Sequence, residues 1–105
     1  MLKCVFRLGE SENVRSFSGF EISGHAGYGE EGNDIVCAAV SSCTMLVCNA
    51  ITENFGAEAE VEVEENRITL RLVKGDSAAQ KLITAFYEHL EMISTDYKKV
   101  KLMII

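Results

Sequence analysis

Residues 34–55, DIVCAAVSSCTMLVCNAITENF, decide the fold, because this stretch contains neither glycine nor proline and is far longer than a strand. Gly56 follows it and is a common residue for ending a helix in the left-handed conformation. The stretch therefore predicts one long helix. Apolar residues surround most of its circumference, whereas a helix at a protein surface carries a single apolar stripe. We expect this helix to be covered on two sides, by a sheet and by a second helix or another subunit.

Two strand-like segments precede this helix. Residues 1–8 are rich in strand formers, residues 9–13 have the composition of a turn, and residues 14–23 alternate imperfectly between apolar and polar. In the second segment the alternation places Phe20 on one face and Phe17 on the other. Together the two segments predict a hairpin with one mainly buried face.

Three further elements follow the long helix. Residues 58–64 and 67–73 alternate cleanly around a short turn and predict a second hairpin with one wet face. Residues 77–97 carry apolar side chains at helical spacing, with Asp76 or Ser77 as a plausible N-cap, and residues 99–105 return to strand character. The order ββαββαβ predicts an α+β fold, a two-layer sandwich of two helices packed on a mostly antiparallel sheet, forming a single domain over residues 1–105.

Charge and hydropathy exclude several classes of function. A net charge of −6 argues against binding to a nucleic-acid backbone and is compatible with a basic partner. No unbroken apolar run approaches the roughly 18 residues that a membrane span needs, and the N-terminus lacks the layout of a secretory signal. We therefore expect a cytoplasmic protein with no membrane partner.

Four cysteines stand at positions 4, 37, 43 and 48, three of them in the long helix. This spacing does not fit the disulfide framework of a small secreted protein, and it lacks the Cys-x-x-Cys pair of a zinc site. We expect reduced thiols and no metal or cofactor. Cys4, Cys43 and Cys48 are interpreted as small buried residues of the core.

Cys37 differs from the other cysteines because it lies in the first turn of the predicted helix, close to Asp34 as a candidate N-cap. The positive end of the helix dipole and the unpaired N–H groups favour a thiolate there, and the same N–H groups can donate to an oxyanion. Ser41 follows one turn later on the same side, within a stripe of small polar residues. From the residues alone, core packing stays the commoner role for such a cysteine, and Ser41 is structural by default.

His25 ends the second strand-like segment and is joined to the helix by the glycine-rich residues 26–33. If this loop folds back, His25 can accept the proton of the Cys37 thiol and later protonate a leaving amine. Asp34 can orient the imidazole, cap the helix, or do both.

The glycine-rich loop has two other interpretations. It resembles a phosphate cradle, but the Gly-Lys-Ser/Thr ending of a P-loop is missing, and Glu30 and Glu31 would repel an anion. The loop can instead close over a substrate, with Tyr28 as an apolar contact.

Gly24-His25-Ala26, followed by GNDIVCAAVS at residues 32–41, closely resembles the ribosomal-processing cysteine protease family known as Prp. Chain length, the ββαββαβ order and the closing hydrophobic strand are also similar to that family. The resemblance implies an endopeptidase that removes the N-terminal extension from the precursor of the basic large-subunit ribosomal protein L twenty-seven. It also implies a homodimer, which would account for the apolar circumference of the long helix.

The same resemblance assigns roles to individual residues. Cys37 matches the nucleophile and His25 the base, while Asp34 and Ser41 match supporting positions. The substrate loop that it implies comprises Gly24, Ala26, Gly27, Tyr28, Gly29 and Gly32.

Two alternatives to a protease stay open at this point. One is a non-catalytic binding or assembly module for a basic ribosomal protein, with Cys37 packed in the core. The other is a redox sensor, which needs a second thiol near Cys37. Helix geometry disfavours it, because Cys43 projects about 120° away and Cys48 lies about 16 Å along the axis.

Overall fold

The computed structural model describes residues 1–9, 16–24 and 34–105. The elements in chain order are β1 (Leu2–Leu8), β2 (Phe17–Gly24), α1 (Ile35–Asn49) with a π-helical continuation (Ala50–Asn54), β3 (Ala59–Glu64), β4 (Arg67–Leu72), α2 (Ser77–Asp96) and β5 (Val100–Ile104). The predicted order ββαββαβ and the α+β class are confirmed.

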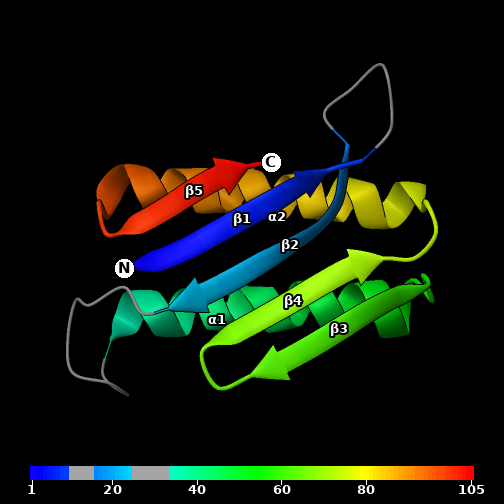
Figure 1. Cartoon of the computed structure of the whole chain (residues 1–105), viewed down its shortest axis with the longest axis horizontal. Coiled ribbons are helices and arrows are strands. Elements are labelled where there is room, and N and C mark those ends of the chain that lie inside the picture. The colour runs from blue at the N-terminus through cyan, green and yellow to red at the C-terminus, as the bar shows by residue number, and fades with distance from the viewer. Residues whose placement is uncertain (10–15, 25–33) are drawn as a thin grey trace.

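The strands form one sheet in the order β3-β4-β2-β1-β5. Among the described strands, the pairs β1/β2, β2/β4 and β3/β4 are antiparallel, and the pair β1/β5 is parallel. Both helices lie on the same face of this sheet, α2 behind β1 and β5 and α1 behind the other strands (Figure 1). The predicted two-layer sandwich with a mostly antiparallel sheet is therefore confirmed.

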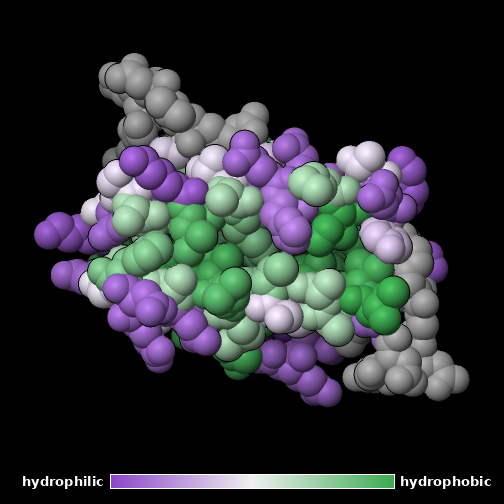
Figure 2. Space-filling view, turned by 180° about the vertical axis from the view of Figure 1, so that it is seen from behind, coloured by the Kyte–Doolittle hydropathy of each residue, from purple (hydrophilic) through white to green (hydrophobic). Residues whose placement is uncertain are grey.

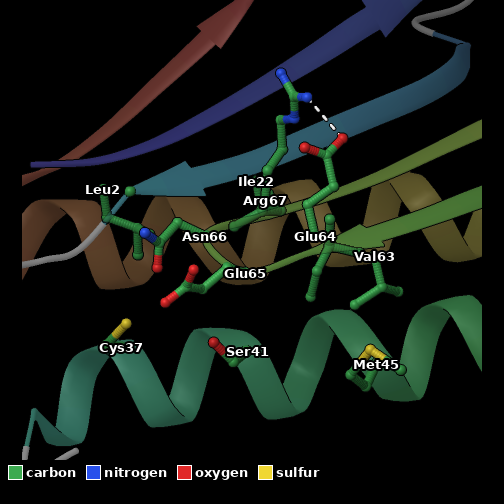
Figure 3. A pocket seen from close by; sticks show the side chains of 12 residues that line it. Leu2, Ile22, Cys37, Ser41, Met45, Val63, Glu64, Glu65, Asn66 and Arg67 are labelled. Atoms are coloured by element: carbon green, nitrogen blue, oxygen red, sulfur yellow. Dashed lines mark hydrogen bonds and ion pairs between the residues drawn. The ribbon is translucent and has the colours of Figure 1, made fainter. Parts of the chain in front are cut away.

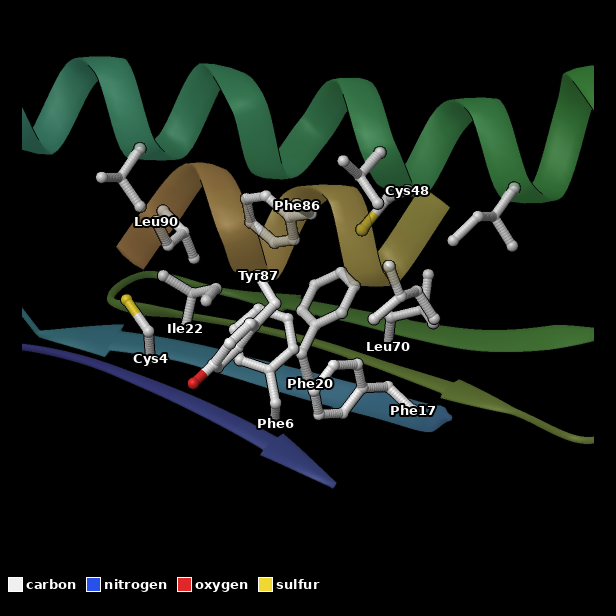
Figure 4. Packing of buried hydrophobic residues seen from close by; sticks show 14 of the residues in the cluster. Cys4, Phe6, Phe17, Phe20, Ile22, Cys48, Leu70, Phe86, Tyr87 and Leu90 are labelled. Carbon is white, nitrogen blue, oxygen red and sulfur yellow. The ribbon is translucent and has the colours of Figure 1, made fainter. Parts of the chain in front are cut away.

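The core lies between the sheet and the helices and is centred on Phe6. The Phe6 ring centroid is 5.3 Å from those of Phe17 and Tyr87, 5.6 Å from that of Phe86 and 5.7 Å from that of Phe20. These rings come from β1, β2 and α2, so the cluster joins the two layers (Figure 4). Edge-to-face pairs at such distances add stabilisation beyond the burial of apolar area.

The prediction that Phe17 points away from the face of Phe20 is wrong, since both side chains are fully buried in the same core. Arg7 pairs with Gly19, but Leu8 pairs with Phe17, which leaves Ser18 as an extra residue in β2. A bulge of this kind shifts the side-chain alternation by one residue. It brings Phe17 to the buried face.

The long helix was predicted over residues 34–55 and differs in its last turn, where α1 gives way to the π-helical turn Ala50–Asn54. Its end at Gly56 is confirmed by a φ of 65°. The second helix begins at Ser77, and Asp76, one of the two predicted N-caps, caps it: its Oδ1 accepts a hydrogen bond of 2.9 Å from the Ala79 N–H.

By length and composition alone, the helix Ile35–Asn54 is apolar enough to cross a membrane, with a mean hydropathy of 1.9. The search for an unbroken apolar run did not find this helix, because scattered Ser and Thr residues interrupt the run without lowering its average much. Core helices of globular domains share this property. Here the helix supplies Val40, Val47 and Ile51 to the core, packed against the sheet.

Candidate functional site

The first turn of α1 is held by Asp34. Its Oδ1 accepts hydrogen bonds of 3.0 Å from the backbone N–H groups of both Val36 and Cys37, and the Asp34 side chain is largely buried. Asp34 has the extended backbone of an N-cap, with φ −77° and ψ 105°. Of the roles left open for Asp34, capping of the helix is therefore confirmed.

This cap changes the expected role of the first-turn N–H groups. Those of Val36 and Cys37 already donate to the Asp34 carboxylate, and that of Ala38 donates to the Asp34 carbonyl oxygen at 3.0 Å. An oxyanion at this turn would therefore share or compete for the N–H groups of Val36 and Cys37 with the Asp34 carboxylate.

Cys37 lines a cavity of about 310 Å³ between α1 and the sheet. Ser41 and Met45 continue the same wall at intervals of one helical turn (Figure 3). Leu2, Ile22, Gly24 and the segment from Val63 to Ile68, which includes the β3–β4 turn, complete the lining. Cys37 and Ser41 lie side by side on the cavity wall, as predicted. Their position alone does not give either residue a chemical role.

Gly24 is the last residue of β2 and fixes the chain at the cavity. Its N–H donates to the carbonyl oxygen of Asn66 at 2.9 Å, and its φ of 88° is one that residues with a side chain rarely adopt. A Cβ at this position would also collide with the carbonyl oxygen of Met1. The structure thus requires glycine where β2 ends beside Cys37.

The stripe of small polar residues on the first helix lies in two environments. Its members are Asp34, Cys37, Ser41, Thr44, Cys48 and Thr52. Thr44 and Cys48 are buried in the core, and the Thr44 hydroxyl donates to the Val40 carbonyl oxygen at 2.6 Å. The Thr52 hydroxyl donates in the same way to the Cys48 carbonyl oxygen at 2.9 Å. Of the stripe residues after Asp34, Cys37 and Ser41 line the cavity, whereas Thr44, Cys48 and Thr52 do not and are structural.

Charged residues of the β3–β4 turn form the wall opposite Cys37. Arg67 Nη2 lies 2.6 Å from Glu64 Oε1, and Arg67 Nη1 lies 3.9 Å from Glu21 Oε1. The hydrogen bond to Glu64 raises the pKa of Arg67, which keeps its guanidinium charged. The cavity therefore combines a half-exposed thiol, an apolar floor and a charged rim.

Several residues predicted to belong to the site lie outside the residues that the structure describes. They are His25, Ala26, Gly27, Tyr28, Gly29 and Gly32. Within the described part of the chain, the site comprises Asp34, Cys37, Ser41 and Gly24.

Sequence reasoning missed the wall that the β3–β4 turn supplies. Glu64, Glu65 and Asn66 are about 30 positions away from Cys37 in the chain, and they reach it because β4 pairs with β2 in the centre of the sheet. The Glu65-Asn66 turn was recognised, but no local pattern indicates which strands become neighbours. The pairing of β2 with β4 was the missing information.

The four thiols differ in their expected reactivity. Burial raises the pKa of the Cys4 thiol to about 12 and that of the Cys48 thiol to about 11, whereas Cys37 and Cys43 are only half-buried. Since the thiolate is the reactive form, iodoacetamide at pH 8 should modify Cys37 and Cys43 in the folded protein and leave the other two intact.

Peptide mass spectrometry after timed alkylation measures this difference. In urea all four cysteines should react at similar rates, which is the control for peptide recovery. Alkylation of Cys4 in the folded protein as fast as that of Cys37 would contradict the described core.

Comparison with known proteins places the chain in a family. The family model for cysteine protease Prp matches residues 1–101. The ribosomal processing cysteine protease Prp of Bacillus subtilis (strain 168) is 30% identical over 105 residues, which are 93% of this chain and 91% of that protein.

Solved structures show the same fold. A complex of the S. aureus ribosomal processing protease Prp with a covalently linked product peptide has a TM-score of 0.90 at 22% identity, with all of both chains covered. A Streptococcus mutans protein has a TM-score of 0.78 at 24% identity, covering 100% of this chain and 99% of the other. The family model and the curated relative both name a cysteine protease, and neither supports the alternatives of a non-catalytic module or a redox sensor. The chain belongs to the Prp family of cysteine proteases.

Proposed function

We propose that Cys37 and His25 form the catalytic dyad of this protease, and that its substrate is the precursor of large-subunit ribosomal protein L twenty-seven. The protease removes the N-terminal extension of that precursor in the cytoplasm. The observation that carries the proposal is the position of Cys37, in the first turn of α1 and in the wall of a cavity that also reaches Gly24. His25 is the residue bonded to Gly24.

The chemistry follows from this arrangement. His25 takes the proton of the Cys37 thiol, and Sγ attacks the carbonyl carbon of the scissile peptide bond. The C–N bond breaks, the proton from His25 goes to the leaving amine, and the extension stays attached to Sγ as a thioester. Water then cleaves the thioester and restores the thiol. Asp34 supports the reaction by fixing the turn that carries Cys37, and Ser41 lies beside the thiol on the cavity wall.

Charge supports a basic substrate. The net charge of −6 attracts a basic precursor over about a Debye length, near 10 Å at moderate salt. No nucleic acid, membrane or cofactor takes part in the proposed reaction.

Incubation with the full-length precursor tests the proposal. Intact mass spectrometry should show the precursor replaced by two products whose masses sum to that of the precursor plus one water. A matched precursor that lacks its N-terminal extension is the control and should keep its mass. A precursor that stays intact, while the protein is folded and its thiols are reduced, would contradict the proposed substrate.

We further propose that the protein is a homodimer joined through the outer face of α1. Between Ile35 and Thr52 this helix carries no charged residue. Ile35 is 74% exposed and Leu46 70% exposed, although both are apolar. Apolar side chains extend across the helical face of the molecule (Figure 2). Contiguous exposed apolar surface of this kind is typical of a protein interface.

The Leu46→Glu variant tests the interface, because a dimer would bury two unpaired carboxylates there. We expect a mass of about 23 kDa by light scattering for the unchanged protein, twice the 11.6 kDa of one chain, and the mass of one chain for the variant. Met92→Glu is the matched control, since Met92 is equally exposed on α2. A mass of 11.6 kDa for the unchanged protein at micromolar concentration would contradict the proposed dimer.

A further inference from the structure

The cavity beside Cys37 has two different sides. Its floor is apolar and comes mainly from Leu2, Ile22 and Ile68 at the ends of the central strands. Its rim at the β3–β4 turn is charged or polar, from Glu64 to Arg67. An apolar floor with a small number of polar groups at its edge is the usual construction of a site that selects its ligand.

The charges of this rim do not cancel. Arg67 is paired with Glu64 at 2.6 Å and also lies near Glu21, so its positive charge is already compensated. Glu65 forms no ion pair with any residue of the described ranges 1–9, 16–24 and 34–105. The rim therefore presents one negative charge for which the described fold supplies no counter-charge.

Glu65 is also aimed at the thiol side of the cavity. Its side chain extends from the turn toward α1 and ends above Cys37 and Ser41, whereas the Glu64 side chain turns away toward Arg67 (Figure 3). Glu65 is also exposed to solvent, so its carboxylate is accessible to a side chain of a peptide bound at Cys37.

We propose that Glu65 is a specificity-determining residue, whose carboxylate pairs with a lysine or arginine side chain of the peptide near the bond cleaved at Cys37. The apolar floor takes an apolar side chain next to that cation. An acidic side chain at the same position is repelled by Glu65. This inference rests on the proposed role of Cys37, so its test includes a measurement that needs no proteolysis.

The first measurement uses Cys37 as a probe of the charge around it. A cationic and an anionic methanethiosulfonate reagent of similar size are compared in a Cys43→Ala background, with modification of Cys37 followed by peptide mass spectrometry. We expect the ratio of cationic to anionic rates to fall about tenfold in Glu65→Gln, because the cation loses an attraction and the anion loses a repulsion. Glu62→Gln is the matched control, since Glu62 is exposed on β3 outside the cavity lining. An equal fall in both variants would mean that only the overall charge acts, and it would overturn the proposal.

The second measurement tests the substrate. Each lysine or arginine near the scissile bond of a cleaved peptide is replaced in turn by norleucine, which keeps the chain and removes the charge. At one position this change should lower kcat/KM of the unchanged protein about fivefold and have little effect on Glu65→Gln. At that position, a glutamate peptide should be cleaved faster by Glu65→Lys than by the unchanged protein.

The outcomes separate this inference from the proposed function. Loss of all cleavage in Cys37→Ala, together with equal norleucine effects in the unchanged and Glu65→Gln proteins, would overturn the role of Glu65 and leave the nucleophile intact. Cleavage that persists in Cys37→Ala would instead overturn the proposed function, and the thiol-probe ratios would still decide whether Glu65 sets the charge of the cavity.

Discussion

The Cys37→Ala variant is expected to lose cleavage of the precursor by a factor of roughly ten thousand or more. Alanine removes the only atom of Cys37 that can form the thioester, and water alone does not attack the peptide bond at a useful rate. The methyl group fits the same half-buried site, and the hydrogen bond of the residue 37 N–H to Asp34 is retained. The fold should therefore survive, which circular dichroism can verify.

Cys43→Ala is the matched control for this variant. Cys43 lies on the same helix and is also half-buried, but it packs against the core and does not line the cavity. It should keep kcat/KM within about twofold, because no proposed step uses it. Retained activity in a folded Cys37→Ala protein would remove Cys37 from the mechanism.

The Phe6→Ala variant is expected to lose about 3–5 kcal/mol of unfolding free energy. The Phe6 ring is fully buried and contacts aromatic rings from both β2 and α2, so its removal leaves a cavity at the joint of the two layers. Domains of this size are typically stable by only about 5–15 kcal/mol. The variant should therefore be partly unfolded at moderate temperature.

Urea unfolding followed by circular dichroism measures this loss. Val5→Ala is the matched control, because Val5 is the neighbour of Phe6 on β1 and is absent from the buried core. Its loss should be about 1 kcal/mol or less. Equal losses for the two variants would contradict a core centred on Phe6.

The elements of this fold were predictable where hydrophobic periodicity acts alone. The two helices, the two hairpins and the closing strand all follow from local patterns, and the N-cap Asp76 was one of the two candidates that the sequence offered. The face of Phe17 was not predictable, since the imperfect alternation of residues 14–23 does not show where an extra residue lies, and the bulge at Ser18 is defined only by the pairing with β1.

The candidate site was predictable on its helical side only. Cys37, Ser41 and Asp34 share one helix, so helical geometry relates their positions directly. The opposite wall depends on the order of strands in the sheet, which brings Glu65 and Asn66 to Cys37 through the pairing of β4 with β2. The engagement of the Val36 and Cys37 N–H groups by the Asp34 cap was not predicted from the sequence, which names Asp34 only as a candidate cap.

The most direct test of the central claim is the intact mass of the protein during turnover. The protein is mixed with excess precursor, quenched in acid after milliseconds to seconds, and analysed by mass spectrometry. We predict a species heavier by the N-terminal extension less one water, with the added mass on the peptide that contains Cys37 and released by hydroxylamine, as a thioester requires. Cleaved precursor with the adduct on another residue would contradict the claim that Cys37 is the nucleophile of this protease.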